Sequence, residues 1–377
     1  MEIQDGNRII HIEGWLPLDR ETDAAFLALF TAFFRDPTAD FQALLGQHLP
    51  TFERAMLAFF DNNAQSNPLQ DRFFTNLTTI WKRYLDQGRL SEAKAFWNRI
   101  VSTTIAWEER TGHRVHKGSA LYFWAVTAII QGETDKGFLL MHAALEEDIL
   151  TQRTPLPRTP ALMFAMLDFS EPRQFFYAFV KQLAGFLSQL LAAYQGLGAS
   201  HLSLEDIQAR FLNHPPSAHA VFSFTHCLAR LHLLDRLPRN SLSSQFAGQY
   251  EIGILSDFAL VIDEALAFKD QPHWRFIDLA VFLSGRASLQ LSRDDLAFAN
   301  ASKDASFDKT LTELIDGVFR FRDGNVRPRL ECDLAICYCI RNHGAHNLSS
   351  FPAVSSRFID LRQSFLNVLF LTVDVLY

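Results

Sequence analysis

Apolar residues recur every three or four positions along most of this 377-residue chain, and this helical spacing constrains the fold more than any other feature. Segments in which apolar and polar residues alternate, as they do in a half-buried strand, are almost absent. Glycine and proline are also scarce, with 17 and 14 residues respectively, which argues against a turn-rich all-β protein. The sequence therefore predicts an all-α protein.

Candidate helices cover most of the chain, and polar or acidic residues stand where several of them begin. Ser91 and Ser203 are examples, because a hydroxyl at a helix start can accept one of the unpaired backbone N–H groups there. The segments predicted to be helical are 22–35, 39–62, 69–87, 90–110, 117–131, 134–150, 171–195, 203–213, 217–235, 250–268, 274–290, 306–321, 328–343 and 355–376.

Composition narrows the class of protein. A net charge of −7 argues against a globally basic nucleic-acid binder, although a local basic patch is compatible with it. Four cysteines in a chain of this length do not form a disulfide framework. The longest apolar runs fall short of the roughly 18 residues that span a bilayer, and the first residues do not resemble a secretory signal. We expect a soluble, cytosolic protein that does not associate with membranes.

A polar, serine-rich stretch at 236–249, interrupted by Pro238, is the strongest candidate for a domain boundary. Chains average roughly 100–200 residues per domain, so 377 residues allow two or three domains. The sequence predicts one domain over 1–240 and a second over 245–377.

One internal similarity lies in the first of these domains. Residues 87–93 recur as residues 131–137, and each copy follows an aromatic-rich helix and precedes another helix. The second copy resembles a tetratricopeptide hairpin, although its 44-residue period exceeds the usual 34 and Gly137 stands where the family has Ala. The large, small, turn-forming and small positions of the motif are occupied by Trp124, Ala125, Gly132 and Ala144. The resemblance implies an irregular helical-repeat region that binds a protein partner.

The candidate catalytic residues near the C-terminus lie at the end of a predicted helix. This helix is apolar on almost every side from Leu334 to Ile340, which indicates burial. Arg341 projects from it, and a buried guanidinium is costly unless it is paired or faces a cleft. Gly344 is placed to end the helix, so that His346 lies in the turn beyond it. A fixed cation and a titratable imidazole are therefore expected close together at one helix end.

Such a pair suits RNA cleavage by internal transesterification. An imidazole with a pKa near 6.5 can take the proton of a ribose 2′-hydroxyl or give a proton to the departing 5′-oxygen. A guanidinium can bind the phosphate oxygens and stabilise the charge that develops on them. The 2′-hydroxyl is itself the nucleophile, so this reaction requires no metal and no cofactor.

Arg341-Asn342-x-x-x-His346 is similar to the Arg-polar-x-x-x-His signature of the HEPN superfamily, which consists of α-helical ribonucleases common in prokaryotic toxins and antiviral systems. The resemblance covers about 250–377 and includes the final amphipathic helix that follows the motif in that family. It implies a HEPN-like helical bundle, a homodimer that brings two motifs together, catalysis by Arg341 and His346, and an Asn342 that orients or contacts RNA. It also implies an effector of antiviral defence or stress response.

A basic loop directly precedes the motif helix. Four arginines, against a single aspartate, stand at Arg320, Arg322, Arg327 and Arg329. Arginines close to an aromatic residue can hold RNA phosphates near a cleavage site. A solvated loop between two helices explains the same composition, and the sequence does not decide between the two.

Other polar residues have simpler explanations. Asp263 or Glu264 can pair with Arg341, since HEPN-like domains often carry an acid on an early helix, but an exposed acid is the default expectation. Cys339 and His343 have the i,i+4 spacing that could share a metal on a helix, but the sequence has no C-x-x-C pair and no second ligand set, so we expect the cysteines 332, 337 and 339 to be small buried residues. The histidines 219, 226 and 232 lack that spacing, so we expect them to be packing or surface residues.

The leading hypothesis is a metal-independent endoribonuclease that acts on RNA as a homodimer. The alternative is a non-catalytic helical adaptor that uses a HEPN-like fold for dimerisation or RNA binding. A third possibility, nucleotide binding or nucleotidyl transfer, lacks the usual phosphate-binding motifs.

Overall fold

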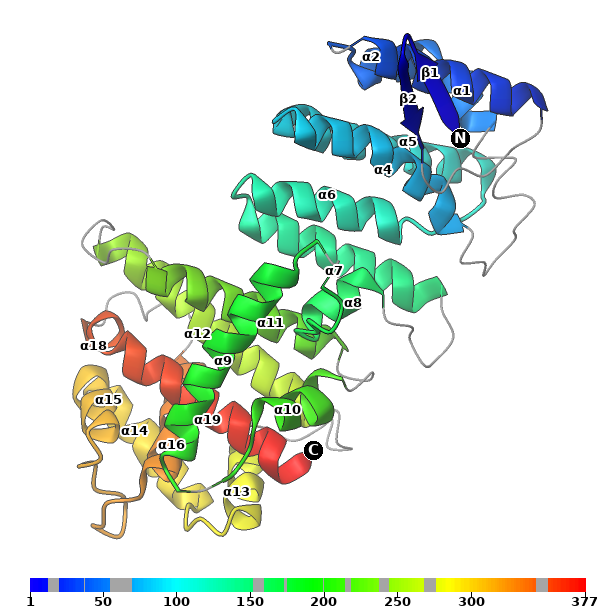
Figure 1. Ribbon diagram of the computed structural model, residues 1–377. Helices are drawn as coiled ribbons and strands as arrows, with labels where there is room; N and C mark the ends of the chain where they lie inside the picture. Colours follow the sequence, from blue (N-terminus) through cyan, green and yellow to red (C-terminus); the bar gives the residue numbers. More distant parts are fainter. Residues whose placement is uncertain are drawn as a thin grey trace. The chain divides into compact units, whose positions relative to one another are not determined.

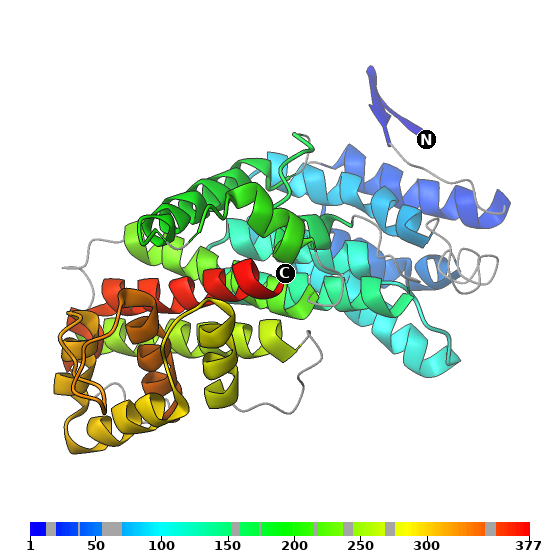
Figure 2. The same ribbon diagram turned by 90° about the horizontal axis from the view of Figure 1, so that it is seen from below.

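The computed structural model describes residues 1–12, 20–36, 38–54, 70–151, 159–172, 175–198, 200–213, 218–236, 244–267, 276–343 and 352–377. The chain divides into two compact units, Met1–Ala161 and Leu162–Tyr377. We call them the N-terminal unit and the C-terminal unit and describe each by itself. Helices make up most of both, which confirms the predicted all-α class (Figures 1 and 2).

The described strands form one small antiparallel hairpin that the sequence analysis missed. Strand β1 (Glu2–Asp5) pairs with β2 (Arg8–His11), and Ile3 stands opposite Ile10. The two strands are joined by a turn in which Gly6 has a φ of +59°, a conformation that favours glycine. Each strand has only four residues, too few for an alternating pattern to be recognised.

Aromatic side chains form the core of the N-terminal unit. Trp97 is completely buried and its ring stacks on Phe123 with centroids 5.6 Å apart. The indole N–H of Trp81 donates to the hydroxyl of Thr127 at 2.8 Å, which satisfies the one polar atom of that buried side chain. The helices of this unit are α1 (Arg20–Arg35), α2 (Phe41–Gln47), α4 (Gln70–Asp86), α5 (Leu90–Thr111), α6 (Gly118–Ile130) and α7 (Thr134–Thr151).

The two similar segments at 87–93 and 131–137 have the same local conformation. Gly88 ends α4 with a φ of +67°, and Gly132 ends α6 with a φ of +82°. In each turn the next residue, Arg89 or Glu133, donates its backbone N–H to the carbonyl five residues earlier, at 2.8 and 2.9 Å. Both are therefore glycine C-caps of the same type, as the repetition in the sequence predicts.

The C-terminal unit holds the remaining helices, with α8 running across the division. They are α8 (Pro160–Ala165), α9 (Tyr177–Gln195), α10 (Leu204–Ile207) with a π-helical turn (Gln208–Leu212), α11 (Ala218–Arg236), α12 (Ser244–Ala267), α13 (Phe276–Arg286), α14 (Arg293–Ala305), α15 (Phe307–Ile315), α16 (Arg329–His343), α18 (Pro352–Ser356) and α19 (Phe358–Leu376). Helix α14 was not among the predicted segments.

Helix α16 packs against α19 in this unit. Asp333 of α16 is fully buried and lies 2.8 Å from the guanidinium of Arg329. The amide of Asn367 on α19 donates to the other oxygen of Asp333 at 2.7 Å. Because a buried carboxylate is stable only with such partners, this network fixes α19 against α16.

The division into units differs from the boundary predicted near residue 240. Helices α9 and α11 belong with α19, since the ring of Tyr194 lies 5.7 Å from that of Phe370 and Arg362 pairs with Asp235. The serine-rich stretch therefore connects α11 and α12 of one compact unit. The contacts of α9 and α11 with α19 place helices from both sides of that stretch in one unit.

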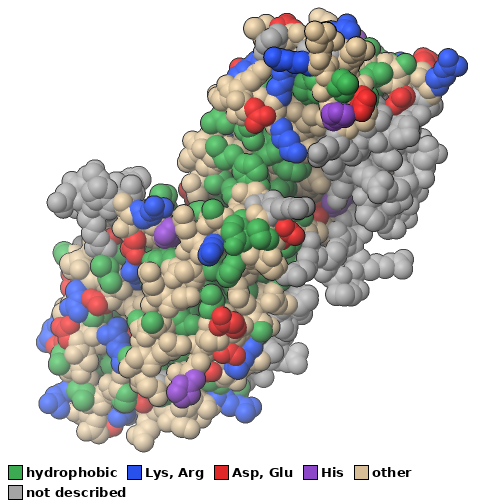
Figure 3. All heavy atoms as spheres, viewed as in Figure 1, with side chains coloured by type: hydrophobic (Ala, Val, Ile, Leu, Met, Phe, Trp, Pro, Cys, Tyr) green, Lys and Arg blue, Asp and Glu red, His purple; other side chains and the backbone are tan. Residues whose placement is uncertain are grey.

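On the face shown in Figure 3, basic and acidic side chains are interspersed over the C-terminal unit. Among the helices of the described ranges, none combines the length and the apolar character that crossing a bilayer requires.

Candidate functional site

Arg341 lies in the last turn of α16. The helix is buried through most of its length, as predicted, and Ile340 is only 3% exposed. The side chain of Arg341 is 37% exposed, so the guanidinium is not buried with the rest of the helix. The last turn brings it to the surface at the end of the helix.

The partner of Arg341 is Asp263 on α12. The Nε and Nη2 groups of the guanidinium donate to the same carboxylate oxygen, Oδ2, at 2.9 and 2.6 Å. The guanidinium carbon also lies 5.4 Å from the ring centroid of Phe276. Burial raises the pKa of Asp263, and Arg341 opposes that rise. Of the two acids that the sequence offers for this pair, Asp263 is therefore the partner, whereas Glu264 is exposed.

The two residues that follow Arg341 contact other helices. The amide of Asn342 donates to the side-chain oxygen of Asn300 on α14 at 3.4 Å, a long hydrogen bond. The imidazole of His343 stacks on Phe307 of α15, with ring centroids 4.3 Å apart. Burial and the charge of Lys303 lower the pKa of His343. Three consecutive side chains thus point toward α12, α14 and α15.

His346, the second predicted catalytic residue, lies outside the described residues, as does Gly344. The structure therefore brings Arg341 and Asn342 together at the end of α16 and gives no position for His346. The pairing of Arg341 with His346 stays a prediction from the sequence.

Three polar residues at this helix end were missed in the sequence analysis. They are Asn300, Lys303 and Asp304, all near the end of α14. The start of α14 carried a usable signal, because the side chain of Ser292 accepts the backbone N–H of Asp295 and that carboxylate accepts the N–H of Ser292 in return. A Ser-x-x-Asp pattern of this kind marks a helix start.

Two arginines of the basic loop are partly buried and bound to groups of the protein itself. The side chain of Arg327 is 12% exposed and pairs with Asp323 at 2.9 Å and with Asp295 at 3.4 Å. Arg329 donates to the carbonyl oxygen of Ile315 at 2.7 Å, in addition to its pair with Asp333. Both guanidinium groups therefore stabilise the fold of this unit.

The other two arginines of the loop are exposed. Arg320 donates to the carbonyl oxygen of Gly324 at 2.9 Å, and Arg322 pairs with the exposed carboxylate of Asp294. Exposed pairs of this kind exchange readily with solvent and contribute little to stability. Arg320 and Arg322 are the members of the predicted RNA-binding set that a phosphate can reach, and their role in RNA binding stays a prediction.

The cysteines have no reactive environment. Cys332, Cys337 and Cys339 are free and buried, as expected of small apolar residues. Burial raises the pKa of Cys332 and of Cys339 to about 12, and it raises the pKa of Cys337 well above its ordinary value. Because the thiolate is the nucleophile and the metal ligand, these thiols are inert in the folded protein.

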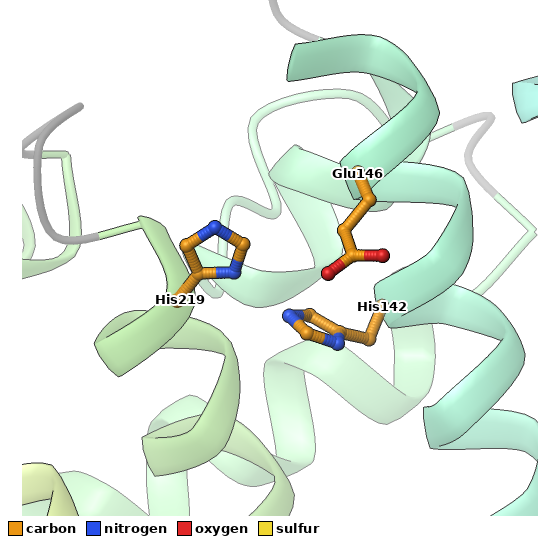
Figure 4. Close-up of side chains that lie close together, drawn as sticks. All are labelled: His142, Glu146 and His219. Carbon is orange, nitrogen blue, oxygen red and sulfur yellow. The ribbon is translucent and has the colours of Figure 1, made fainter. Parts of the chain in front are cut away.

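Among the described histidines outside α16, His116 is buried with its Nε2 2.9 Å from a carboxylate oxygen of Asp148, whereas His232 packs against an aromatic ring. The ring of His232 lies 5.1 Å from that of Phe186, and burial lowers its pKa. Figure 4 shows His142 and Glu146 one turn apart on α7, and His219 in the first turn of α11. Helices α7 and α11 belong to different units. Within its own unit, the pair on α7 supplies two side chains, fewer than a typical protein zinc site requires.

The N-terminal unit carries an open groove of about 580 Å³ between its two glycine turns. An ion pair between Lys94 on α5 and Glu133 in the α6–α7 turn lies along it. The groove is lined by Gly88, Leu90, Ser91, Glu92, Lys94, Ile130, Gln131 and Glu133. Most of the lining is polar.

Comparisons with protein-family models, with curated proteins and with solved structures found no match for this chain.

Proposed function

We propose that the C-terminal unit is a HEPN-like, metal-independent endoribonuclease. The observation that carries the proposal is the guanidinium of Arg341, which is 37% exposed at a helix end and oriented by Asp263. A cation held in a fixed direction at the surface can bind a phosphodiester without first losing much side-chain freedom.

The contacts of Arg341 leave one side of its guanidinium for RNA. Asp263 takes up the Nε and Nη2 groups. Within the described residues, the Nη1 group is the remaining donor, and it can donate a hydrogen bond to a phosphate oxygen. As the 2′-oxygen attacks phosphorus, negative charge grows on the phosphate oxygens, and a guanidinium beside them stabilises the transition state.

The remaining roles come from the sequence motif. His346 takes the proton of the 2′-hydroxyl or gives one to the departing 5′-oxygen, and Asn342 contacts the RNA. The products are a 2′,3′-cyclic phosphate and a 5′-hydroxyl. The resemblance to HEPN ribonucleases also supports a homodimer, in which two copies of the motif form one cleft.

The N-terminal unit is proposed to sense a protein partner or to restrain the nuclease activity of the C-terminal unit. Its two glycine turns and the groove between them support a tetratricopeptide-like region that binds a protein partner. Together, the two units fit an effector of antiviral defence or stress response in which partner binding controls RNA cleavage.

The test is incubation of RNA with the purified full-length protein in EDTA. Wild type, Arg341→Ala and His346→Ala are compared, with Arg293→Ala as a control for loss of an exposed arginine elsewhere in the C-terminal unit. We expect cleavage by wild type and by the control, with a rate at least a hundredfold lower in the two motif variants. Equal cleavage by all four proteins contradicts the proposal.

The alternative is a non-catalytic adaptor. The full pairing of Arg341 with Asp263 favours it, because a neutralised cation attracts phosphate less strongly. RNA binding or dimerisation without cleavage by any form of the protein supports this alternative.

A further inference from the structure

A buried histidine and a buried carboxylate meet in the N-terminal unit. Residues 112–117 form the loop that joins α5 to α6, and His116 lies near the end of this loop. Its side chain faces Asp148 in the last turn of α7, and its Nε2 lies 2.9 Å from Oδ1 of that residue. His116 is 8% exposed and Asp148 is 4% exposed. The contact therefore joins the loop to α7 away from bulk solvent.

The space beside this pair leaves no room for a further side chain. A Cβ on Gly118, the first residue of α6, would lie 2.7 Å from Cε1 of His116 and 2.8 Å from Oδ1 of Asp148. Cβ atoms do not approach other atoms this closely, so one of the two groups would have to move. The packing of α6 thus holds the pair in place together with the contact between its two members.

Two cations and two other carboxylates lie in the same loop and in its neighbouring helices. Lys117 donates to both carboxylate oxygens of Glu108 on α5, at 2.7 and 2.9 Å. Glu147 on α7 lies 3.3 Å from the guanidinium of Arg114 and 3.5 Å from the ammonium of Lys117. These four groups balance one another in charge.

Asp148 is a third carboxylate in this network. Removal of an ionised carboxylate from water is costly unless a positive charge lies beside it. A protonated His116 supplies that charge at 2.9 Å and donates a hydrogen bond to the same oxygen. A neutral imidazole can still donate the hydrogen bond but lacks the charge, so the contact becomes weaker.

We propose that His116 and Asp148 form a pH-sensitive latch, closed by protonation of His116, that holds the α5–α6 loop on α7. The latch belongs to the N-terminal unit and is independent of RNA cleavage. With the latch closed, the folded unit binds the proton of His116 more tightly than the unfolded chain does. The stability that the latch contributes is therefore complete below about pH 6.5, the ordinary pKa of histidine, and is lost as pH rises through the folded midpoint.

The first measurement is an NMR titration of the full-length protein with ¹³C-labelled histidine, in which His116→Gln assigns the resonance of His116. We expect its midpoint to lie above about 6.5 in wild type. Asp148→Asn keeps the shape of the side chain and removes its charge, so it should lower the midpoint by about one pH unit or more. Gly118→Ala keeps every charge but separates the pair, and it should lower the midpoint as well.

A wild-type midpoint at or below the ordinary value overturns the proposal. A midpoint that Asp148→Asn leaves unchanged does the same. If Asp148→Asn does not fold, the wild-type midpoint and the second measurement still decide.

The second measurement is hydrogen exchange of the full-length protein near pH 6 and near pH 8, corrected for the intrinsic pH dependence of exchange. Peptides that cover 112–118 should lose protection by up to about tenfold at the higher pH, as a difference of one unit in the midpoint implies. In His116→Gln their protection should be low at both pH values.

His113→Gln is the matched control, because it removes an exposed histidine from the same loop. It should lose protection with pH as wild type does. Protection that does not depend on pH in wild type contradicts the latch, and so does a pH dependence that persists in His116→Gln.

Discussion

Arg341 and Asp263 are 78 residues apart in the chain, yet two N–H groups of the guanidinium meet one carboxylate oxygen at 2.9 and 2.6 Å. The contact joins the end of α16 to α12. It also leaves the side chain of Arg341 37% exposed, so the same residue is both oriented and accessible. The stability that the pair contributes is small, because half-exposed ion pairs contribute about 1 kcal/mol or less.

Replacing Asp263 by Asn tests whether this orientation matters. The variant keeps the shape of the side chain and loses its charge, so the direction of the guanidinium is no longer fixed. We expect the RNA cleavage rate to fall about tenfold to a hundredfold, the usual cost of a misplaced catalytic group. The midpoint of thermal unfolding should change little. Glu264→Gln, on the adjacent exposed residue, is the matched control and should cleave at the wild-type rate.

Replacing Arg329 by Met should destabilise the C-terminal unit. The substitution leaves Asp333 fully buried without its cation, a change that costs about 3 kcal/mol in comparable sites. Urea unfolding followed by circular dichroism measures the loss. Unchanged stability together with weaker RNA binding would show instead that Arg329 contacts RNA.

The loss in Arg329→Met should also depend on pH. Burial raises the pKa of Asp333 in the folded protein, so the folded state binds this proton more tightly than the unfolded state. Stability therefore falls as pH rises from about 4, the ordinary value for Asp, through the folded pKa. Without Arg329 the folded pKa rises further, and the destabilisation should be larger at pH 8 than at pH 5.

Two glycine substitutions should change stability in opposite directions. A Cβ at Gly137 would overlap Cγ1 of Ile129 and lie 3.1 Å from the carbonyl oxygen of Ala125. We expect Gly137→Ala to destabilise by about 1–3 kcal/mol, as overpacking does. Gly185 on α9 has open space around it, so Gly185→Ala should stabilise by about 0.5–1 kcal/mol.

Thermal unfolding of the two single variants measures both effects. The double variant Gly137→Ala with Ile129→Ala removes the clash and should recover part of the loss. Destabilisation by Gly137→Ala that is simply additive with Ile129→Ala contradicts the proposed steric cause.

Arg320→Gln and Arg322→Gln test the accessible half of the basic loop. If these side chains contact phosphates, each substitution should weaken RNA binding and reduce the salt dependence of the binding constant by about one counterion. Fluorescence anisotropy at several salt concentrations measures both quantities. Arg286→Gln, an exposed arginine on α13, is the control. An unchanged salt dependence in both loop variants identifies a solvated loop without a role in RNA binding.

The sequence by itself determined the helical class, most of the individual helices and the two glycine turns. These features depend on local properties: the spacing of apolar residues, and the need for glycine where φ is positive, as at Gly88 and Gly132. The apolar character of α16 likewise predicted its burial. Local patterns did not predict the β1–β2 hairpin, because four-residue strands are too short to show an alternating pattern.

Only the tertiary structure decided which distant residues meet. In the folded unit Arg341 pairs with Asp263 and not with Glu264. Lys303 and Asp304 act electrostatically on His343. Arg327 and Arg329 pair with carboxylates of the same unit. The tertiary structure also placed α9 and α11 with α19 in one compact unit. Such contacts depend on how whole helix faces pack together, and the free energy of that packing is a property of the assembled unit rather than of any short segment.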